Sequence, residues 1–319
     1  MKELPSIAFL GEALLELAPS GQAQNFRLGV AGDIFNTAAA VAQLGVPSNL
    51  VTAVGDIATD QIFFDRAEAL AISTKFVQRD RSRHAGLYLI NNDENGERSF
   101  VYWRSNSAAR HLFGSRDQLD QVLTSLRGIP YWYFSGITLA LLSSESLEVL
   151  IKHLIAFRHR GGKVVYDNNY RPALWASAAH FRSTDQLVLP QVDIFLPSLD
   201  DAISSGVAQS ETEALARFRS LAVPEIVLKN GTEPVVLLYE GSEVSIPVKA
   251  QSPVVDTTGA GDGFNGGYLA ARLLGHTPAE AVQVGMRVSG TVVCHRGAIL
   301  PPEQWQALRQ CVFDKGVRI

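Results

Sequence analysis

Residues 254–275 read VVDTTGAGDGFNGGYLAARLLG. A short apolar run typical of a strand is followed by a glycine-rich turn and then by a helical pattern that Gly275 closes. Gly259 and Gly261 let the backbone approach a ligand closely, because they have no side chain. The N–H groups and the macrodipole at the start of the next helix favour an anion. The stretch therefore predicts a phosphate-binding turn after a strand.

Asp262 stands beside those N–H groups. A carboxylate is poorly placed there if anion binding is the only purpose, since its charge repels the ligand. A base that takes a proton from a hydroxyl attacking a phosphoryl group has to lie within reach of that group. The plainer alternative is a carboxylate that caps the helix. From the residues alone, both interpretations stay open.

Two other nucleotide-binding patterns fit this chain less well. Residues 261–266 match G-x-G-x-x-G, but no Asp or Glu occurs between 281 and 295, where a dinucleotide site needs an acid for the ribose. A Walker A sequence, GxxxxGK[ST], occurs nowhere in the chain.

Upstream of this stretch, short β-rich runs alternate with helical patterns near 144–160 and 177–190. This alternation predicts an α/β fold with a mostly parallel central sheet flanked by helices on both faces. Ligands in such sheets lie beyond the carboxyl ends of the strands. The runs end in polar or glycine residues at Ser135-Gly136, Asp167-Asn168-Asn169, Pro197-Ser198 and Lys229-Asn230-Gly231.

The first third of the chain contains a predicted β-hairpin, GLYLI-NNDENGE-RSFVYWR at 86–104, with a turn at Asn95-Gly96. The two-residue period places Phe100, Tyr102 and Arg104 on one face of the second strand, and Val101 and Trp103 on the other. The pairing register with Tyr88 stays open. We expect a single domain, 1–319, with a small β-sheet lid from about 11–33 and 82–107.

DTTGAGD followed by a glycine-rich helix resembles the C-terminal signature of the ribokinase-like (PfkB) carbohydrate kinases. That resemblance implies the ribokinase-like fold, ATP as phosphoryl donor and Asp262 as catalytic base. It also implies that Gly259, Ala260 and Gly261 form the anion hole for the transferred phosphoryl group.

The N-terminal signature of the same family is matched by AGDIFNTAAAVAQLG at 31–45. The resemblance implies that Gly32, Asp33 and Asn36 face the sugar. Asp33 as a helix N-cap and Asn36 as a surface residue of that helix are the plainer alternatives.

RSFVYWRSNSAAR, SGITLALLS and GGKVVYDNNYRPALW resemble the 2-keto-3-deoxygluconate kinases of this family, which bind a sugar acid. A planar guanidinium suits a carboxylate, so Arg104 and Arg171 are predicted to hold it, with hydroxyls from Tyr88 and Tyr102. Ordinary surface arginines and packing tyrosines are the alternatives. The expected activity is phosphorylation of the 6-hydroxyl of 2-keto-3-deoxygluconate. A fructokinase or other neutral-sugar kinase, or a non-catalytic sugar-acid sensor, stays an alternative.

For the nucleotide, the resemblance implies Ser198, Lys229 and Gly231 beside the two glycines of the anion hole. The family's N-x-x-E pattern, which places Mg²⁺ through water, is replaced here by Ser198-Leu-Asp-Asp201. Mg²⁺ is expected nonetheless, because phosphates and water hold most of its coordination sphere. A K⁺ site is expected near Asp256 and the loop 296–298.

Composition limits the partners. The 319 residues are 46% hydrophobic with net charge −4, and no Lys/Arg run exceeds two, so neither nucleic acid nor a membrane surface is an expected partner. With two cysteines, Cys294 and Cys311, and no leader pattern, we expect a cytoplasmic protein with reduced thiols. The apolar face with Val101 and Trp103 predicts a homodimer or higher homo-oligomer through the lid.

Overall fold

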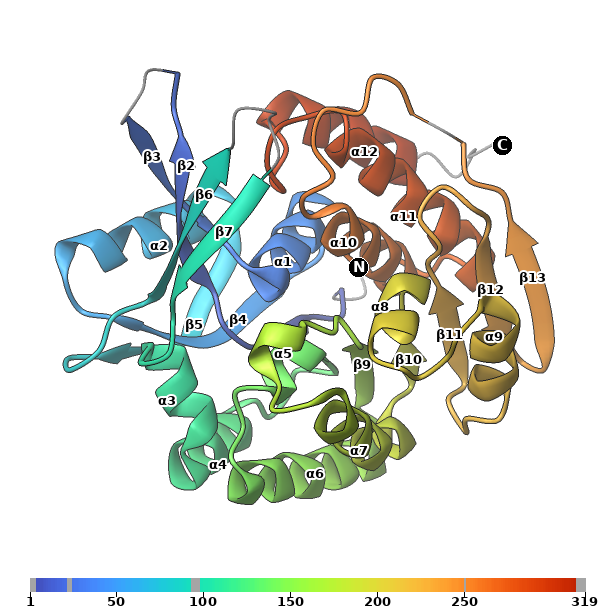
Figure 1. Cartoon of the computed structure of the whole chain (residues 1–319), viewed down its shortest axis with the longest axis horizontal. Coiled ribbons are helices and arrows are strands. Elements are labelled where there is room, and N and C mark those ends of the chain that lie inside the picture. The colour runs from blue at the N-terminus through green and yellow to red at the C-terminus, as the bar shows by residue number, and fades with distance from the viewer. Residues whose placement is uncertain (1–3, 22–24, 93–97, 250, 314–319) are drawn as a thin grey trace.

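The computed structural model describes residues 4–21, 25–92, 98–249 and 251–313, and these form two β-sheets flanked by helices (Figure 1). Strands from β11 to β5 are parallel to their neighbours, whereas β12 runs antiparallel to β11 and β13. The predicted, mostly parallel central sheet is therefore confirmed. In spatial order its strands are β13 (Ser242–Ile246), β12 (Val235–Tyr239), β11 (Glu225–Leu228), β10 (Ile194–Phe195), β9 (Lys163–Asp167), β8 (Tyr131–Ser135), β1 (Ile7–Leu10), β4 (Ser48–Gly55) and β5 (Ile72–Asp80).

Helices cover both faces of this sheet, as the alternating pattern predicted. Within the described ranges, no helix combines the length and apolarity needed to cross a bilayer. One face carries α1 (Asp33–Gln43), α2 (Ala58–Ala69), α10 (Ala260–Leu273), α11 (Pro278–Val292) and α12 (Pro302–Phe313). The other carries α3 (Ala108–Gly114), α4 (Arg116–Ser125), α5 (Gly136–Leu139), α6 (Ser144–His159), η1 (Pro172–Leu174), α7 (Ala178–Val188), η2 (Leu189–Gln191), α8 (Leu199–Ser204) and α9 (Glu211–Arg219).

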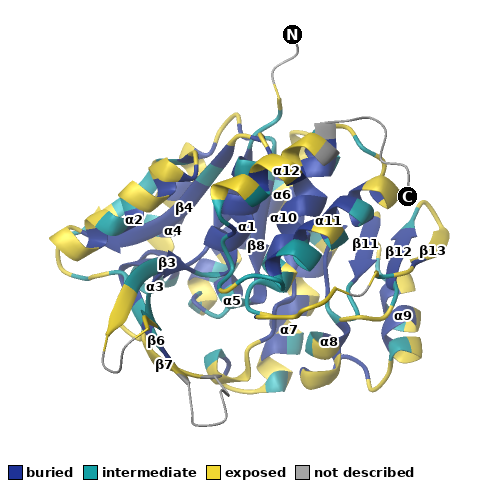
Figure 2. Ribbon diagram, turned by 90° about the horizontal axis from the view of Figure 1, so that it is seen from above, coloured by how far each residue is buried: buried dark blue, intermediate teal, exposed yellow. Residues whose placement is uncertain are grey.

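The sheet separates two hydrophobic cores, and the central strands are buried on both faces (Figure 2). In β1 the side chains alternate between the cores: Ile7 and Phe9 join the core under α1 and α10, whereas Ala8 and Leu10 join the core under α4 and α6. A strand that is buried on both faces reads as a continuous apolar run, which is how this strand appears in the sequence.

Small residues let α1 and α10 pack in near contact on one of these faces. A Cβ on Gly266 would lie 2.4 Å from the Cβ of Ala40 and 3.0 Å from the carbonyl oxygen of Thr37. A larger side chain at Gly266 would push the two helices apart. This close packing brings the two family signatures, 226 residues apart at Asn36 and Asp262, into hydrogen-bonding contact.

The smaller sheet consists of β3 (Phe26–Ala31), β2 (Leu14–Pro19), β6 (Gly86–Asn92) and β7 (Arg98–Trp103), in that order. These strands lie within 11–33 and 82–107, and the division into one domain and a lid stays a prediction. β6 and β7 pair antiparallel with Tyr88 opposite Tyr102, which settles the register that the sequence left open. The predicted turn at Asn95-Gly96 lies outside the described residues.

One element was predicted wrongly. Residues 254–256 do not form a strand before the glycine-rich turn. The amides of Val255 and Asp256 donate to the carbonyl oxygen of Val293 instead of to a neighbouring strand. The side chains of Val254 and Val255 are exposed, so the apolar run reflects a surface segment and not a buried strand.

Candidate active site

Asp262 lies in the first turn of α10, directly after the glycine-rich turn. Gly259 is the N-cap residue and has a left-handed φ of 73°, and a Cβ there would lie 2.2 Å from the Cβ of Ala298. Only glycine fits this position. A Cβ on Gly261, by contrast, would meet nothing within 4 Å, so space remains open above the helix end. First-turn N–H groups have no partner within a helix and are suited to a phosphate.

The carboxyl group of Asp262 has a perturbed pKa. Burial, followed by the nearby charge of Asp33, raises the pKa to about 7, although a hydrogen bond from Asn36 and the charge of Arg171 act in the opposite direction. No side-chain cap closes the N-terminus of α10, so Asp262 does not serve as the helix cap. A carboxylate whose pKa lies near neutral pH is well suited to accept a proton from an alcohol.

Asp33 and Asn36 of α1 face Asp262 from the neighbouring helix. Gly32 is the N-cap, with φ 123°, so Asp33 is not the cap residue. The Asp33 carboxylate accepts hydrogen bonds from the Ser135 hydroxyl and, at 3.4 Å, from the Asn169 side-chain amide. The Asn36 amide nitrogen donates to Asp262 Oδ2 at 2.8 Å. Its oxygen is buried without a hydrogen-bond partner among the described residues, so it is available to a hydroxyl of a ligand.

Asn36→Ala is expected to move the acid limb of the kcat/KM profile to higher pH by about one pH unit. The Asn36 N–H group stabilises the charged form of Asp262, so its removal raises the pKa of the carboxyl group. Profiles of kcat/KM between pH 5.5 and 9 measure this shift. An unchanged midpoint, or a shift to lower pH, would contradict the assignment of that limb to Asp262.

The smaller sheet brings Tyr88 and Tyr102 to the same side of the site. Their ring centroids are 5.7 Å apart. Tyr88 is buried, and its hydroxyl donates to Glu16. Burial and Glu16 are the main causes that raise the pKa of Tyr88, and the charge of Asp262 adds a smaller contribution. The Tyr88 ring therefore lies within electrostatic reach of the Asp262 carboxylate. Tyr102 is 51% exposed. A polar ligand could thus contact hydroxyls of the smaller sheet and Asp262 together.

The two predicted carboxylate-binding arginines have acidic partners. Arg104 follows β7, and its guanidinium forms an ion pair with the buried Glu12. Its charge also partly offsets the burial that raises the pKa of Asp33. Arg171 precedes η1, is half exposed, and forms an ion pair with Asp201 at 3.1 Å. Arg171 acts to lower the pKa of Asp262, so its charge lies within electrostatic reach of that carboxyl group, whereas the charge of Arg104 reaches Asp33.

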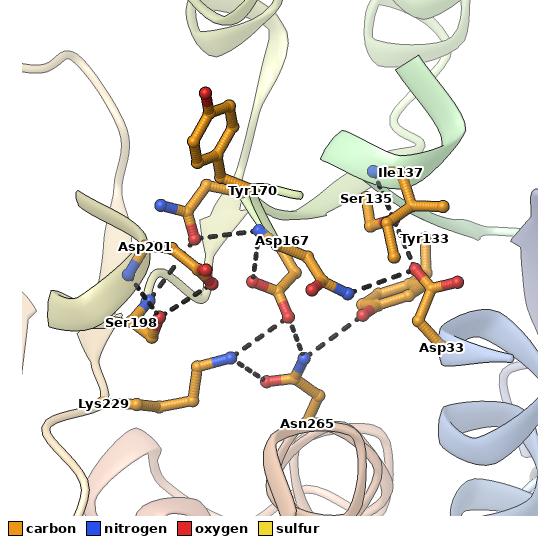
Figure 3. Close-up of polar contacts among 12 residues, drawn as sticks. Asp33, Tyr133, Ser135, Ile137, Asp167, Tyr170, Ser198, Asp201, Lys229 and Asn265 are labelled. Carbon is orange, nitrogen blue, oxygen red and sulfur yellow. Dashed lines mark hydrogen bonds and ion pairs between the residues drawn. The ribbon is translucent and has the colours of Figure 1, made fainter. Parts of the chain in front are cut away.

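A buried polar network lies beneath this space (Figure 3). The Lys229 ammonium contacts Asp167 Oδ2 at 3.1 Å and Asn265 Oδ1 at 3.0 Å. The Asn265 amide nitrogen in turn donates to Asp167 at 2.6 Å and to the Tyr133 hydroxyl at 3.2 Å. Lys229, which was expected to contact the nucleotide, thus places its ammonium group against Asp167 at the end of β9. The network fixes α10 against the carboxyl ends of β8, β9 and β11.

Sequence reasoning did not single out Asn265, but a signal was present. Asn265 lies three residues after Asp262, so helical periodicity places both on one face of α10. Polar residues at the ends of the central strands, such as Ser135 and Asn169, were recognised only as positions from which a site could be built. Their common partner, Asp33, could not be foreseen from spacing.

The remaining predicted nucleotide positions lie at the ends of β10 and β11. Ser198 forms an isolated bridge with Lys229 and caps α8, accepting from the amide of Asp201 at 3.1 Å. Gly231, with φ 56°, is surrounded by open space.

Asp256 lies against the loop that was expected to help to form a cation site. Its two carboxylate oxygens accept from the amides of Thr258 at 3.0 Å and Gly297 at 2.7 Å. Among the described residues, no group of three or more His, Cys, Asp and Glu side chains could hold a metal ion. A cation at this edge would therefore depend on carbonyl oxygens, phosphates and water.

A separate cavity of about 670 Å³ lies at the amino ends of β8 to β11, away from these residues. Its three cations are paired with acids: Lys163 with Asp193, Arg219 with Glu243 and Arg272 with Glu225. The remaining charged lining residue, Glu240, is acidic, so no cation of this cavity is left over for an anionic ligand. The carboxyl ends of the strands, where ligands bind in parallel sheets, remain the candidate active site.

Comparison with known proteins shows similarity along nearly the whole chain. The chain is 38% identical over 308 residues to the 2-dehydro-3-deoxygluconokinase of Escherichia coli (strain K12), covering 94% of this chain and 99% of that relative. The fructokinase of Vibrio cholerae O395, solved with fructose, ADP and calcium, has a TM-score of 0.81 at 21% identity, with 96% and 99% of the two chains covered. The aminoimidazole riboside kinase of Salmonella enterica, complexed with its riboside and an ATP analog, has a TM-score of 0.79 at 22% identity, with 95% and 99% covered.

The TM-scores of these two structures confirm the ribokinase-like fold. Their sequence identities are low, so the two structures are evidence for the fold alone. Residues 6–305 match the family model described as pfkB family carbohydrate kinase, which spans both signatures and the strands between them. The chain therefore belongs to the pfkB family of carbohydrate kinases.

Proposed function

We propose that the protein transfers the γ-phosphoryl group of ATP to the 6-hydroxyl of 2-keto-3-deoxygluconate, also called 2-dehydro-3-deoxygluconate. The product is 2-keto-3-deoxy-6-phosphogluconate. The observation that carries the phosphoryl-transfer step is Asp262, held at a glycine-formed helix N-terminus with a pKa of about 7. The identity to the Escherichia coli relative supports the choice of sugar acid.

In the proposed reaction Asp262 accepts the proton of the 6-hydroxyl as its oxygen forms a bond to the γ-phosphorus. The bond between that phosphorus and the oxygen bridging to the β-phosphate breaks, and ADP leaves. The N–H groups of Gly259 and Gly261 stabilise charge on the transferring group, the kind of interaction expected to dominate phosphoryl transfer. The N–H group of Ala260 donates to the carbonyl oxygen of Thr257 at 3.2 Å, so its contribution to the anion hole requires a bifurcated hydrogen bond. The bound hydroxyl must lie in line with the leaving oxygen, which the packing of α1 on α10 helps to fix.

The charge of ATP needs cations in addition to these amides. Mg²⁺ on the phosphates would neutralise the developing charge. Ser198 and Asp201 already bond to each other at 2.8 Å, so they fit a water-mediated contact to the ion better than direct ligation. We include in this proposal a K⁺ ion near Asp256, which would stabilise the loop 296–298 that packs against Gly259.

Recognition of the sugar acid is assigned to the two arginines. A guanidinium has five N–H donors, so Arg104 and Arg171 can each bind a carboxylate while they keep their acidic partners. Tyr88, Tyr102 and the unpaired oxygen of Asn36 supply further hydrogen-bonding groups for the hydroxyls. A neutral sugar would leave the cations without a substrate partner and bind more weakly.

The position of phosphorylation tests the proposed chemistry. Incubation with ATP and 2-keto-3-deoxygluconate should yield ADP and a product whose phosphorus couples to the C6 protons in ³¹P–¹H NMR spectra. Phosphate on any other hydroxyl, or ATP hydrolysis without a phosphorylated sugar, would contradict the proposed placement of the substrate.

We further propose that the smaller sheet forms a homodimer interface through its outer face. Cross-strand pairing aligns Leu28, Leu17, Leu89 and Val101 in one row, and Trp103 pairs with Leu87 on the same face. Val101 is 40% and Trp103 is 55% exposed, so this face presents two large apolar side chains to solvent. A second copy of this face would cover them.

Trp103→Glu is expected to weaken this dimer by at least about tenfold, because a charge would be buried in an apolar interface. Light scattering over a concentration series measures the effect. Leu187→Glu is the matched control, since Leu187 on α7 is also 55% exposed but lies far from the smaller sheet. A wild-type monomer at all concentrations, or equal effects of both variants, would refute the interface.

A further inference from the structure

Glu12 lies where the chain crosses from the large sheet to the smaller one, in the segment between β1 and β2. It is 1% exposed. The chain crosses between the sheets in three other segments: between β3 and α1, between β5 and β6, and between β7 and α3. Glu12 is contacted or closely approached by Gly32, Arg104 and Ser107 of these crossings and by Gly86, the first residue of β6.

Two glycines leave room for Glu12 at this junction. A Cβ on Gly32 would lie 2.8 Å from the Glu12 carbonyl oxygen, and Gly32 has a φ of 123° that other residues rarely adopt. A Cβ on Gly86 would lie 2.9 Å from Glu12 Oε1 and 3.1 Å from the Cβ of Arg104. The junction is therefore packed too closely around Glu12 for either glycine to carry a side chain.

The Glu12 carboxylate has two partners on the crossing after β7. Oε1 accepts a hydrogen bond from the Ser107 hydroxyl, and Oε2 forms the ion pair with Arg104 Nη2. Ser107 also caps α3 by accepting from the amide of Arg110 at 3.1 Å. Burial raises the pKa of Glu12, whereas Arg104 and Ser107 act in the opposite direction. The carboxylate thus ties Arg104 to the fixed end of a helix.

The Arg104 guanidinium lies within the electrostatic influence of two carboxylates, Glu12 and Asp33. Its side chain is 12% exposed, and Nε is buried without a hydrogen-bond partner among the described residues. A long side chain that is free to choose rotamers would lose entropy on binding a ligand. One that is already held by Glu12 has lost that freedom before the ligand arrives.

We propose that Glu12 is a positioning residue that holds the Arg104 guanidinium at the junction of the two sheets, aimed at the carboxylate of the sugar acid. The inference rests on the proposed role of Arg104. The Glu12 side chain is buried against Arg104 and Ser107, so in this proposal it affects sugar-acid binding through Arg104 alone. If the ion pair only stabilised the fold, loss of the Glu12 charge would lower stability without weakening sugar-acid binding through Arg104.

A double-mutant cycle on Glu12→Gln and Arg104→Met tests the proposal in the full-length protein. Glu12→Gln keeps the shape of the side chain and removes its charge. We expect a rise of about tenfold in KM for 2-keto-3-deoxygluconate, with kcat and the KM for ATP within about twofold of wild type. In the Arg104→Met background, Glu12→Gln should raise KM no further.

Ser107→Ala is the matched control, because it removes the other partner of the same carboxylate and the cap of α3 while the ion pair remains. It should lower the melting temperature but leave KM within about twofold. If Glu12→Gln does not fold, Glu12→Asp keeps the charge one methylene away from Arg104. That variant should also raise KM at constant kcat, and an unchanged KM would overturn the inference.

The other outcomes separate the two proposals. If Arg104→Met raises KM and Glu12→Gln does not, or if the two effects multiply in the double variant, the positioning role is wrong and the role of Arg104 stands. If Arg104→Met leaves KM unchanged, the proposed role of Arg104 fails and the inference fails with it.

Discussion

Asp262→Asn is expected to lower kcat by about 10² to 10⁴-fold while changing the KM values for ATP and the sugar acid by only a few fold. The amide keeps the size of the side chain and the contact with Asn36, but it cannot accept the proton of the 6-hydroxyl. Single-turnover measurement of phosphoryl transfer separates this loss from slower product release. Turnover equal to wild type would remove Asp262 as the base.

The pH dependence gives a second readout of the same residue. Because the base acts only when it is deprotonated, kcat/KM of the wild type should fall as pH decreases through about 7, the raised pKa of Asp262. Asp262→Asn should lose this limb. Asp185→Asn is the matched control, since burial raises the pKa of Asp185 to about 7 as well, but its partner is Tyr166 beneath α7. That control should keep the limb.

Arg104→Met is expected to raise the KM for 2-keto-3-deoxygluconate by about 10- to 100-fold, since one charge-assisted hydrogen bond contributes about 1.5–3 kcal/mol. The KM for fructose, if fructose is turned over at all, should not rise. Initial rates with saturating ATP measure both values.

The variant also leaves Glu12 buried without its cation, a loss of about 3–5 kcal/mol of stability for a broken buried pair. Rates should therefore be compared well below its melting temperature. Arg158→Met is the control, because it removes an ion pair with the buried Asp193 at the opposite edge of the sheet. If Arg104→Met raises the KM for both sugars alike, Arg104 does not recognise the carboxylate.

Much of the fold followed from periodicity. The runs 131–134 and 164–166 consist of apolar and aromatic residues because both faces of β8 and β9 are buried. The polar residues that follow them are predictable as the ligand edge of the sheet. The segment 254–256 shows the limit of that reasoning. An apolar run becomes a strand only when a neighbour offers backbone partners, and here the carbonyl of Val293 takes that place.

The parts of the site that lie within one short sequence motif were predictable from the sequence. Asp262 and its glycines are at most three residues apart, so their proximity to one another at the helix N-terminus follows from helix geometry. The contacts of Lys229 and Arg104 could not be foreseen, because Asp167 is 62 residues from Lys229 and Glu12 lies at the opposite end of the chain from the main signature. Such pairings depend on which segments of the chain lie next to one another in the folded protein, and sequence spacing does not determine this.

The most direct test of sugar-acid phosphorylation is kcat/KM of the wild type on 2-keto-3-deoxygluconate, fructose and ribose under one ATP concentration. Two arginines that each contribute one charge-assisted bond predict a preference for the keto-deoxy acid of about 10² or more. A value for fructose or ribose that equals or exceeds it would contradict the account of specificity. Binding of the sugar acid without turnover of any substrate would contradict catalysis by Asp262.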